Sequence, residues 1–167
     1  DRSLVGSEMC IRDRITAGNS SQISDGAAAL LLVSEDILNK FNLEPIAKIR
    51  SMAVVGTDPV LMLSGPIPAT RKALDQAKLK PEDINLAEIN EAFSSVVGAW
   101  RKEFPEINYE NVNANGGSIA IGHPLGATGA RLMTNLIHEM KRNKLKYGLQ
   151  AICEGGGTAN ATIVELV

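Results

Sequence analysis

The sequence predicts a layered α/β domain in which helices pack on a mixed sheet. Two observations carry this prediction. Apolar runs of strand length alternate with segments of helical periodicity along most of the chain, and the chain closes with two strand-like runs that are joined through glycines. Alternating strands and helices that end in a hairpin are typical of this class, and no repeat, linker or low-complexity tract divides the chain.

The first part of the chain contains two expected strands around one expected helix. Ala27–Val33, with the sequence AAALLLV, is a continuous apolar run that suits a strand buried on both faces. Ser34 is followed by two acidic residues, which predicts a helix cap leading into Ile37–Phe41. Ile46–Val55 is rich in apolar and β-branched residues and ends at Gly56, so we expect a strand there.

The middle of the chain predicts two helices that flank a short strand. Pro66 and Pro68 introduce a helix whose apolar stripe is rich in alanine. A turn at residues 81–83 then leads into a strand around Ile84–Ile89. Asn90 follows as the expected cap of the next helix, whose apolar face contains Ala92, Phe93, Val96, Val97 and Trp100.

The last part of the chain predicts one long helix and the closing hairpin. The helix places Leu132, Met133, Leu136, Ile137 and Met140 on one face, and two basic residues follow at its C-terminal end, where cations suit the helix dipole. Gly148–Cys153 and Thr158–Leu166 are the two expected strands of the hairpin.

The composition is that of an ordinary globular protein. Of the 167 residues, 44% are hydrophobic and 22% are charged, and the net charge of −2 offers no electrostatic footprint for nucleic acid or an anionic membrane surface. The longest apolar run is far too short to cross a bilayer. Two cysteines do not make a disulfide framework, which favours a reducing compartment such as the cytoplasm.

Residues 1–14 have neither strand nor helix patterning. We expect them to be a non-native or disordered terminus and leave Cys10 out of the fold with them. Residues 15–167 are then expected to form the domain, as the back part of a longer protein.

Three places in the chain carry side chains of the kinds that take part in catalysis. They are Asn90, His123 in a glycine-rich turn, and Cys153 before a run of three glycines. Each also has a simpler interpretation, because Asn90 caps a helix equally well and Cys153 is also a suitable small core residue. His138 lies off the apolar stripe of its helix and is interpreted as a surface residue.

His123 is the strongest of these candidates. It lies in a turn just before a helix N-terminus, where backbone N–H groups and the helix dipole favour developing negative charge. A phosphate cradle is the competing interpretation of the same glycines, but no Walker lysine follows, and two histidines without a ligand-spaced cluster make a metal site weaker still. A cysteine, a histidine and amide donors together suit acyl transfer.

Four segments together resemble the C-terminal half of a thiolase. They are ITAGNSSQISDGAAALLLVSE, EINEAFSSVV, NANGGSIAIGHPLGATGARL and CEGGGTANATIVE, and they occur in the order of that family from about Ile15 to Val167. The resemblance implies a thiolase-like fold in which helices lie against a mixed five-stranded sheet. It also implies an acyltransferase that cleaves or forms 3-ketoacyl-CoA by reversible thiolysis and Claisen condensation with acetyl-CoA.

The resemblance also assigns roles to individual residues. His123 matches the histidine that activates the nucleophilic cysteine and helps bind the thioester oxygen, and Cys153 matches the second cysteine, which moves a proton to and from the substrate. Asn90 matches the residue that holds a water in the first oxyanion hole, and the backbone N–H of Gly155 contributes to the second. Ser21 matches a serine along the pantetheine arm of CoA. A thiol with a pKa near 8.5 exchanges protons around neutral pH if its surroundings lower that value modestly.

The resemblance implies partners and leaves alternatives open. The acyl-accepting cysteine of the family lies in the N-terminal half, to which no position here corresponds, so the 167-residue chain alone is expected to be inactive. Partners are then acyl-CoA, acetyl-CoA, CoA and an N-terminal thiolase half, in a homodimer or homotetramer, with no cofactor besides the CoA thioester substrate. A ketoacyl synthase-like condensing enzyme and a non-catalytic acyl-CoA-binding subunit are the alternatives.

Overall fold

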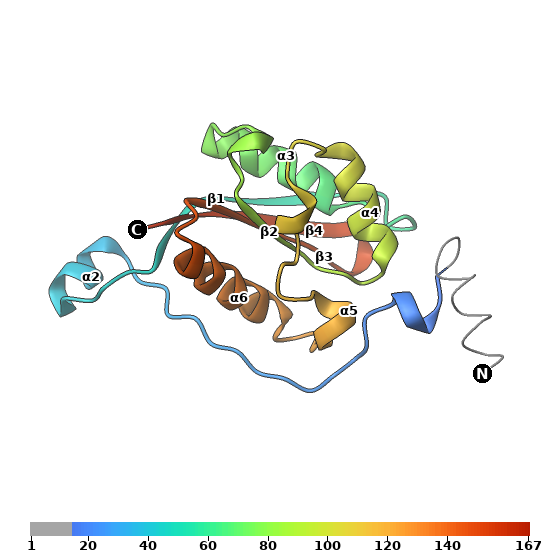
Figure 1. Ribbon diagram of the computed structural model, residues 1–167, viewed down its shortest axis with the longest axis horizontal. Coiled ribbons are helices and arrows are strands. Elements are labelled where there is room, and N and C mark those ends of the chain that lie inside the picture. The colour runs from blue at the N-terminus through green and yellow to red at the C-terminus, as the bar shows by residue number, and fades with distance from the viewer. Residues whose placement is uncertain (1–14) are drawn as a thin grey trace.

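The computed structural model of the chain describes residues 15–167 (Figure 1). The expectations for residues 1–14, including Cys10, therefore lie outside the described residues. The elements are α2 (Glu35–Phe41), β1 (Ala47–Gly56), α3 (Pro66–Ala77), β2 (Leu86–Ile89), α4 (Ser94–Glu103), α5 (Ser118–Ile121), α6 (Thr128–Asn143), β3 (Tyr147–Cys153) and β4 (Thr158–Leu166). Short 3-10 turns cover Ala17–Asn19, Pro81–Asp83, Tyr109–Asn111 and Gly155–Gly157.

The strands form one mixed sheet in the order β1-β4-β3-β2. β4 pairs antiparallel with both β1 and β3, and this arrangement confirms the closing hairpin. β2 and β3 are parallel, with Leu86 opposite Gly148 and Ile89 opposite Ala151. Because these two strands run in the same direction, their carboxyl ends meet at one edge of the sheet.

The expectation of five strands is wrong for the described residues, where the sheet has four. Ala27–Val33 is not a strand, although its apolar run resembles one. This segment belongs to an exposed strap, residues 20–34, that passes outside α5 and α6 and away from the sheet (Figure 1). Leu31 remains 81% exposed and Leu32 66% exposed. A strand needs a neighbouring backbone for its hydrogen bonds, and no described strand lies beside this run.

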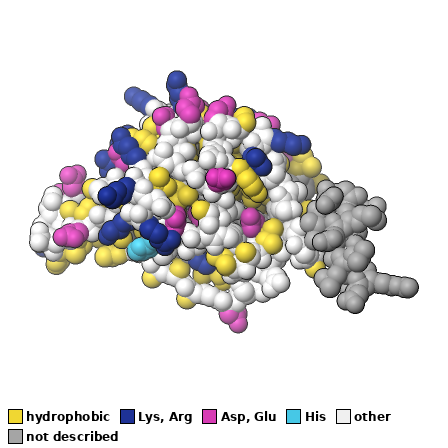
Figure 2. Space-filling view, in the orientation of Figure 1, with side chains coloured by type: hydrophobic (Ala, Val, Ile, Leu, Met, Phe, Trp, Pro, Cys, Tyr) yellow, Lys and Arg dark blue, Asp and Glu magenta, His cyan; other side chains and the backbone are white. Residues whose placement is uncertain are grey.

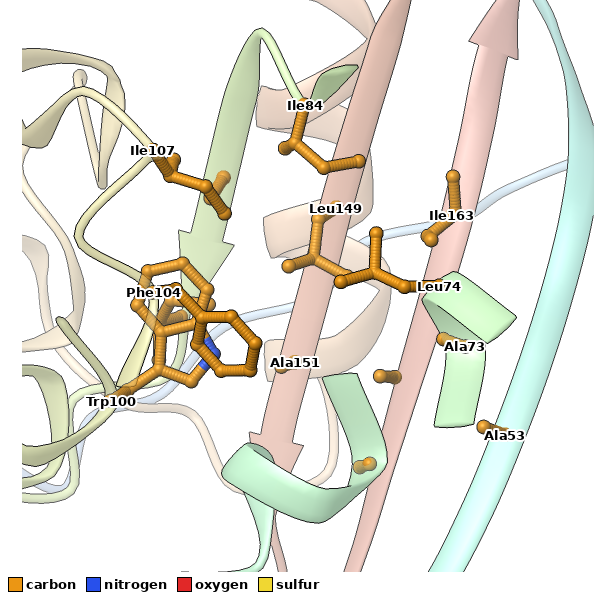
Figure 3. Packing of buried hydrophobic residues seen from close by; sticks show 14 of the residues in the cluster. Ala53, Ala73, Leu74, Ile84, Trp100, Phe104, Ile107, Leu149, Ala151 and Ile163 are labelled. Atoms are coloured by element: carbon orange, nitrogen blue, oxygen red, sulfur yellow. The ribbon is translucent and has the colours of Figure 1, made fainter. Parts of the chain in front are cut away.

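One face of the sheet carries a closed apolar core under α3 and α4. Figure 3 shows Trp100 and Phe104 packed beside Leu149, while Leu74 of α3 faces Ile163. The Trp100 Nε1–H donates a hydrogen bond of 2.9 Å to Thr70 Oγ1, so the indole nitrogen is satisfied although the side chain is completely buried. The two helices and this face of the sheet therefore form a single dry layer.

The other face is covered by α6, and only in part. Leu136 and Met140 of α6 pack on Leu86 and Val164, as the expected apolar stripe requires. α6 packs mainly on β2 and β3. Since Ser51 and Ala53 of β1 face α3, Met52 and Val54 project to the opposite face, where they remain 65% and 64% exposed.

Helix starts agree with the sequence in most places but not at Asn90. Ser34 accepts a hydrogen bond from the Ile37 N–H at the start of α2, and α3 begins at Pro66. α4, however, begins at Ser94, and the residue at its cap is Phe93. Asn90 does not cap the helix, because its own N–H donates to Ala151 O and keeps it in line with the sheet.

The surface of the described part is mixed in character. Figure 2 shows basic and acidic side chains interspersed along the edge over α3 and α4, without a large region of one sign. Within residues 15–167, no helix is long and apolar enough to cross a membrane.

Candidate active site

Asn90 and Cys153 come together because they follow parallel neighbouring strands. Asn90 comes directly after β2, and Cys153 is the last residue of β3. The Asn90 N–H donates to Ala151 O at 2.9 Å, which holds the two strand ends side by side. Both side chains are buried, with exposed fractions of 1% for Asn90 and 8% for Cys153. The carboxyl edge of the parallel pair thus presents an amide and a thiol next to each other.

The side-chain amide of Asn90 is held on one side only. Its Oδ1 accepts a hydrogen bond of 2.8 Å from the hydroxyl of Ser118, at the start of α5. Its Nδ2 is buried and has no hydrogen-bond partner among the described residues. A buried amide donor without a partner costs free energy, and such a group is a recurrent feature of ligand-binding sites.

Cys153 is a buried thiol whose surroundings favour the neutral form. Burial raises the pKa of this thiol, and the neighbouring Glu154 carboxylate adds to the increase, while the Asn90 side chain works in the opposite direction. These surroundings therefore do not supply the modest lowering of the pKa on which thiol proton exchange around neutral pH depends. At neutral pH the group is a protonated thiol, which is the form that donates a proton.

The turn that carries His123 is fixed by hydrogen bonds to its backbone and its ring. The His123 N–H donates to Gln22 O at 2.8 Å, and Nδ1 lies 2.7 Å from Thr128 Oγ1 at the start of α6. The Thr128 hydroxyl donates its only proton to Pro124 O at 3.0 Å. Both hydrogen bonds of Thr128 form together when the imidazole ring carries its proton on Nδ1, and this tautomer leaves Nε2 as an acceptor.

His123 is also held in its neutral form. Partial burial lowers the pKa of the imidazole, and the positive charge of Arg131 lowers it further. A neutral imidazole with an unprotonated Nε2 is the form that takes a proton from a thiol.

The first turn of α6 brings the His123 loop to the same end of the sheet as Cys153. Gln150 Nε2, on β3, donates a hydrogen bond of 2.6 Å to Gly129 O. A Cβ atom at Gly129 would lie 3.6 Å from Ile152 Cδ1, so the helix start rests on the end of β3. The structure therefore gathers Asn90, Cys153 and His123 around one edge.

Ser21 lies between the Asn90 loop and the His123 loop. Its backbone N–H and its hydroxyl both approach Ala92 O, at 3.1 and 3.3 Å. The next residue, Gln22, accepts the His123 N–H. The predicted pantetheine serine therefore lies beside the site as part of the segment that joins the two loops.

The glycines divide into those that the backbone requires and those that leave space. Gly122 has φ = +87°, and a side chain there would collide with Ser24. Gly157 has φ = +84°, and a Cβ would lie 2.6 Å from Thr57 O. At Gly126 and Gly155, in contrast, an added Cβ would have no other atom within 4 Å. Of these four glycines, Gly126 and Gly155 are therefore the ones that leave room for a ligand to approach the backbone.

A hollow lies between the strap and the residues that follow His123 in its turn. Its volume is about 410 Å³, and it is lined by residues 24–28 of the strap and 124–127 of the turn. Its lining does not include Cys153, so a single cleft that joins His123 with Cys153 stays a prediction.

Among the residues described, no group of His, Cys, Asp and Glu side chains could hold a metal ion. His138 lies exposed on α6, as its place on the helix predicts.

Four polar residues of the site were missed by reasoning from the sequence. Ser118, Thr128 and Arg131 lie within segments that read as glycine-rich turn or amphipathic helix, and Glu88 lies within a buried strand. A carboxylate in the middle of a short apolar strand is a signal that could have been followed for Glu88. The other three are ordinary residues in ordinary helical positions, and only the structure indicates their partners.

Comparison with known proteins defines the family to which this chain belongs. The family model for the thiolase C-terminal domain matches residues 43–166. The steroid 3-ketoacyl-CoA thiolase FadA6 of Mycobacterium tuberculosis is 55% identical over 152 residues, which are 91% of this chain and 37% of the relative. The 3-ketoacyl-CoA thiolase FadA of Escherichia coli is 45% identical over 159 residues, which are 94% of this chain and 41% of the relative.

Solved structures agree with these sequence matches. The crystal structure of the Bacillus anthracis acetyl-CoA acetyltransferase superposes with a TM-score of 0.88 at 44% identity, covering 92% of this chain and 39% of that one. The human mitochondrial 3-ketoacyl-CoA thiolase in complex with CoA superposes with a TM-score of 0.84 at 39% identity, with the same coverage. The chain belongs to the thiolase family and carries its C-terminal domain. It spans about two fifths of the length of the relatives that it matches.

Proposed function

We propose that this chain supplies the C-terminal half of a thiolase active site. The reaction is reversible thiolysis of 3-ketoacyl-CoA by CoA to acyl-CoA and acetyl-CoA, and the acyl-accepting cysteine is contributed by an N-terminal thiolase half. The observation that supports the proposal is that Asn90 and Cys153 follow neighbouring parallel strands, while the helix start after the His123 turn rests on the end of β3. The family match and the coverage of about two fifths of each relative support it.

Each of these side chains suits one step of the reaction. His123 takes the proton of the nucleophilic thiol at Nε2, and the resulting thiolate attacks the C3 carbonyl of the substrate. The C2–C3 bond then breaks, its electron pair forms the enolate of acetyl-CoA, and the Cys153 thiol donates the proton that this enolate needs. The Cys153 thiolate then takes the thiol proton of the second CoA, whose sulfur displaces the acyl group from the nucleophile, and His123 returns its proton to the nucleophilic cysteine.

The oxyanions of these steps need fixed hydrogen-bond donors. The buried Nδ2 of Asn90 has no partner among the described residues, so it is available to bind a water or an oxygen in the site. Gly155 is exposed and sterically open, which suits its backbone N–H to the second oxyanion position. Ser21 lies next to the Asn90 loop and is proposed to line the pantetheine arm of CoA.

Partners and location follow from the same proposal. The substrates are acyl-CoA, acetyl-CoA and CoA, and the chemistry requires no cofactor besides the CoA thioester. The complete enzyme is proposed to be a homodimer or homotetramer of fatty acid β-oxidation, located in the cytoplasm. A free buried thiol at Cys153 is compatible with a reducing compartment.

The proposal is tested by restoring a complete active site. Residues 15–167 can replace the matched C-terminal segment of the Bacillus anthracis acetyl-CoA acetyltransferase, and the chimaera should cleave acetoacetyl-CoA in the presence of CoA. Cys153→Ala in this chimaera should lower turnover by about 10²- to 10⁴-fold, because it removes a general acid–base group, while radiolabelled acetyl-CoA still acylates the protein. The 167-residue chain alone should cleave no acetoacetyl-CoA.

A second test of the proposal is His123→Ala in the chimaera. Its matched control is His138→Ala, since His138 lies exposed on α6. Only the His123 variant should lose acylation. Turnover by the isolated chain would mean that the nucleophile has been misplaced. A chimaera that binds CoA without cleaving acetoacetyl-CoA would instead support a non-catalytic acyl-CoA-binding subunit.

A further inference from the structure

A buried polar chain connects Arg131 with the candidate catalytic amide. Arg131 Nη2 donates to Ser118 Oγ at 3.2 Å and to Gly122 O at 3.0 Å. Ser118 is completely buried and donates in turn to Asn90 Oδ1 at 2.8 Å. One guanidinium nitrogen thus joins the loop that carries Asn90 to the residue directly before His123.

The direction of these hydrogen bonds is fixed by the chemistry of arginine. A guanidinium only donates, so Ser118 Oγ must accept from Arg131 and use its own proton elsewhere. In the structure the Ser118 hydroxyl donates that proton to Asn90 Oδ1, so the carbonyl oxygen of the amide faces Ser118. The NH₂ group of Asn90 is then turned away from Ser118, on the side where it has no partner among the described residues.

Electrostatics supports the same arrangement. The Arg131 Nε and Nη1 atoms are also buried without partners among the described residues. The Glu88 side chain, 1% exposed on β2, is the buried acid on which the charge of Arg131 acts. The same charge acts on the imidazole of His123. Arg131 is therefore placed to influence both catalytic loops, although the chemistry above assigns it no contact with substrate.

We propose that Arg131 and Ser118 are positioning residues that orient the Asn90 amide so that it presents a hydrogen-bond donor to the site. Without Ser118, the amide is free to rotate and to present its oxygen to the same position. That oxygen would repel an oxyanion, and a bound water would have to donate to it instead of accepting from the NH₂ group. The carbonyl of Gly122, held by the same guanidinium, fixes the start of the His123 turn. This inference rests on the proposed thiolase function for its kinetic consequences but not for its geometry.

The kinetic test is a double-mutant cycle in the complete enzyme. Ser118→Ala should lower kcat about three- to ten-fold, the effect of one lost hydrogen bond, with little change in the KM for acetoacetyl-CoA. In the Asn90→Ala background, Ser118→Ala should have no further effect, because its only route of action has been removed. Equal, additive losses in both backgrounds would overturn the inference, since a merely structural residue acts independently of Asn90.

The second test needs no enzymatic activity. The sequence holds two histidines, His123 and His138, so NMR titration of ¹³C-labelled histidine rings in the whole chain gives two signals. Arg131→Gln should raise the pKa of His123, because it removes a positive charge that lowers it. Arg131→Lys keeps the charge and should preserve the low pKa of His123 while kcat still falls, and it provides a folded alternative if Arg131→Gln is unstable. The matched control is Arg71→Gln, at an exposed arginine of α3, which should leave the pKa of His123 unchanged.

The two tests separate the inference from the proposed function. An enzyme with no thiolysis in any variant would contradict the proposed function, and the titration would then decide the inference alone. If the pKa of His123 is the same in wild type and Arg131→Gln, Arg131 does not face the His123 turn and the inference fails.

Discussion

The two faces of the sheet differ in what they bury. The face under α3 and α4 buries mainly hydrocarbon, with Trp100 and Leu149 at its centre. Its buried polar groups, among them the Trp100 indole and the hydroxyls of Thr70 and Ser51, are paired by hydrogen bonds. The face under α6 buries hydrocarbon only around Leu136, and towards the carboxyl edge it buries Glu88 together with polar partners of Asn90. Dispersion and the hydrophobic effect hold the first face, whereas the second also contains polar groups that are costly to bury.

Because of this difference, residues that mainly stabilise the fold lie on one face of the sheet, and residues of the candidate site lie on the other. Successive residues of a strand point to opposite faces, so β2 contributes Ala87 and Ile89 to the dry layer and Glu88 to the polar one. A substitution on the first face is thus expected to change folding, and one on the second to change both folding and proton equilibria. Three predictions test this separation, in order of decreasing effect.

The largest effect is expected at the centre of the dry face. Trp100→Ala should destabilise the chain by about 3–5 kcal/mol, because it leaves a cavity where the ring now packs 5.0 Å from Phe104 and also removes the partner of Thr70. Denaturant unfolding of the chain, followed by circular dichroism, measures the change.

The control for this prediction is Phe41→Ala, which removes an aromatic ring that is 61% exposed on α2. Its effect should stay within about 0.5 kcal/mol. Similar losses for the two variants would show that the face under α3 and α4 is no more tightly packed than the surface of α2.

A smaller effect, of opposite sign, is expected at Glu88 on the polar face. Burial raises the pKa of this carboxyl to about 7; Glu91 and Glu139 add to the increase, and Arg131 opposes it. Between about pH 4.5 and 7 the unfolded chain loses its proton before the folded chain does, so the folded state loses stability as the pH rises. Glu88→Gln should therefore match the wild type near pH 5 and be more stable at pH 8, by up to about 3 kcal/mol.

The measurement is the free energy of unfolding at several pH values from 5 to 8. Glu106→Gln, at an exposed position, is the control and should follow the wild type throughout. A wild-type stability that does not decrease over this range would show that Glu88 is already ionised without cost. In that case the two faces would not differ in proton equilibria.

Much of the fold was predictable because the spacing of apolar residues along a helix or strand indicates which of its faces is buried. The apolar stripe of α6, the proline start of α3 and the closing hairpin all follow from local patterns, and the structure confirms each of them. The prediction of a strand at Ala27–Val33 was wrong. An apolar run favours a strand by its composition, but a strand also needs a neighbouring strand to pair with, and the local sequence does not show whether one is present. Asn90 was wrongly predicted as a cap because its side chain finds Ser118, 28 positions away, which local sequence cannot indicate.

The site was predictable only in its principal members. Asn90, His123 and Cys153 stand in recognisable segments, and the resemblance assigns them roles. The residues that orient them, Ser118 and Arg131, are brought near by packing of α5 and α6 against the strand ends. The raised pKa of Cys153 was missed for a related reason, since burial depends on the whole fold and not on neighbours in sequence.

The smallest effect on stability is expected where α6 leaves its face of the sheet uncovered. Met52 and Val54 of β1 are 65% and 64% exposed, so replacing both with serine removes little buried surface and should change the free energy of unfolding by less than about 1 kcal/mol. The same residues form part of an apolar surface that we expect to drive self-association of the isolated chain. Sedimentation velocity should therefore detect weaker association in Met52→Ser/Val54→Ser than in the wild type.

The matched control is Val60→Ser/Leu61→Ser, which removes two hydrophobic side chains that are 90% and 69% exposed outside the sheet. If both pairs reduce association equally, general surface hydrophobicity is responsible, and the uncovered part of the sheet has no special role.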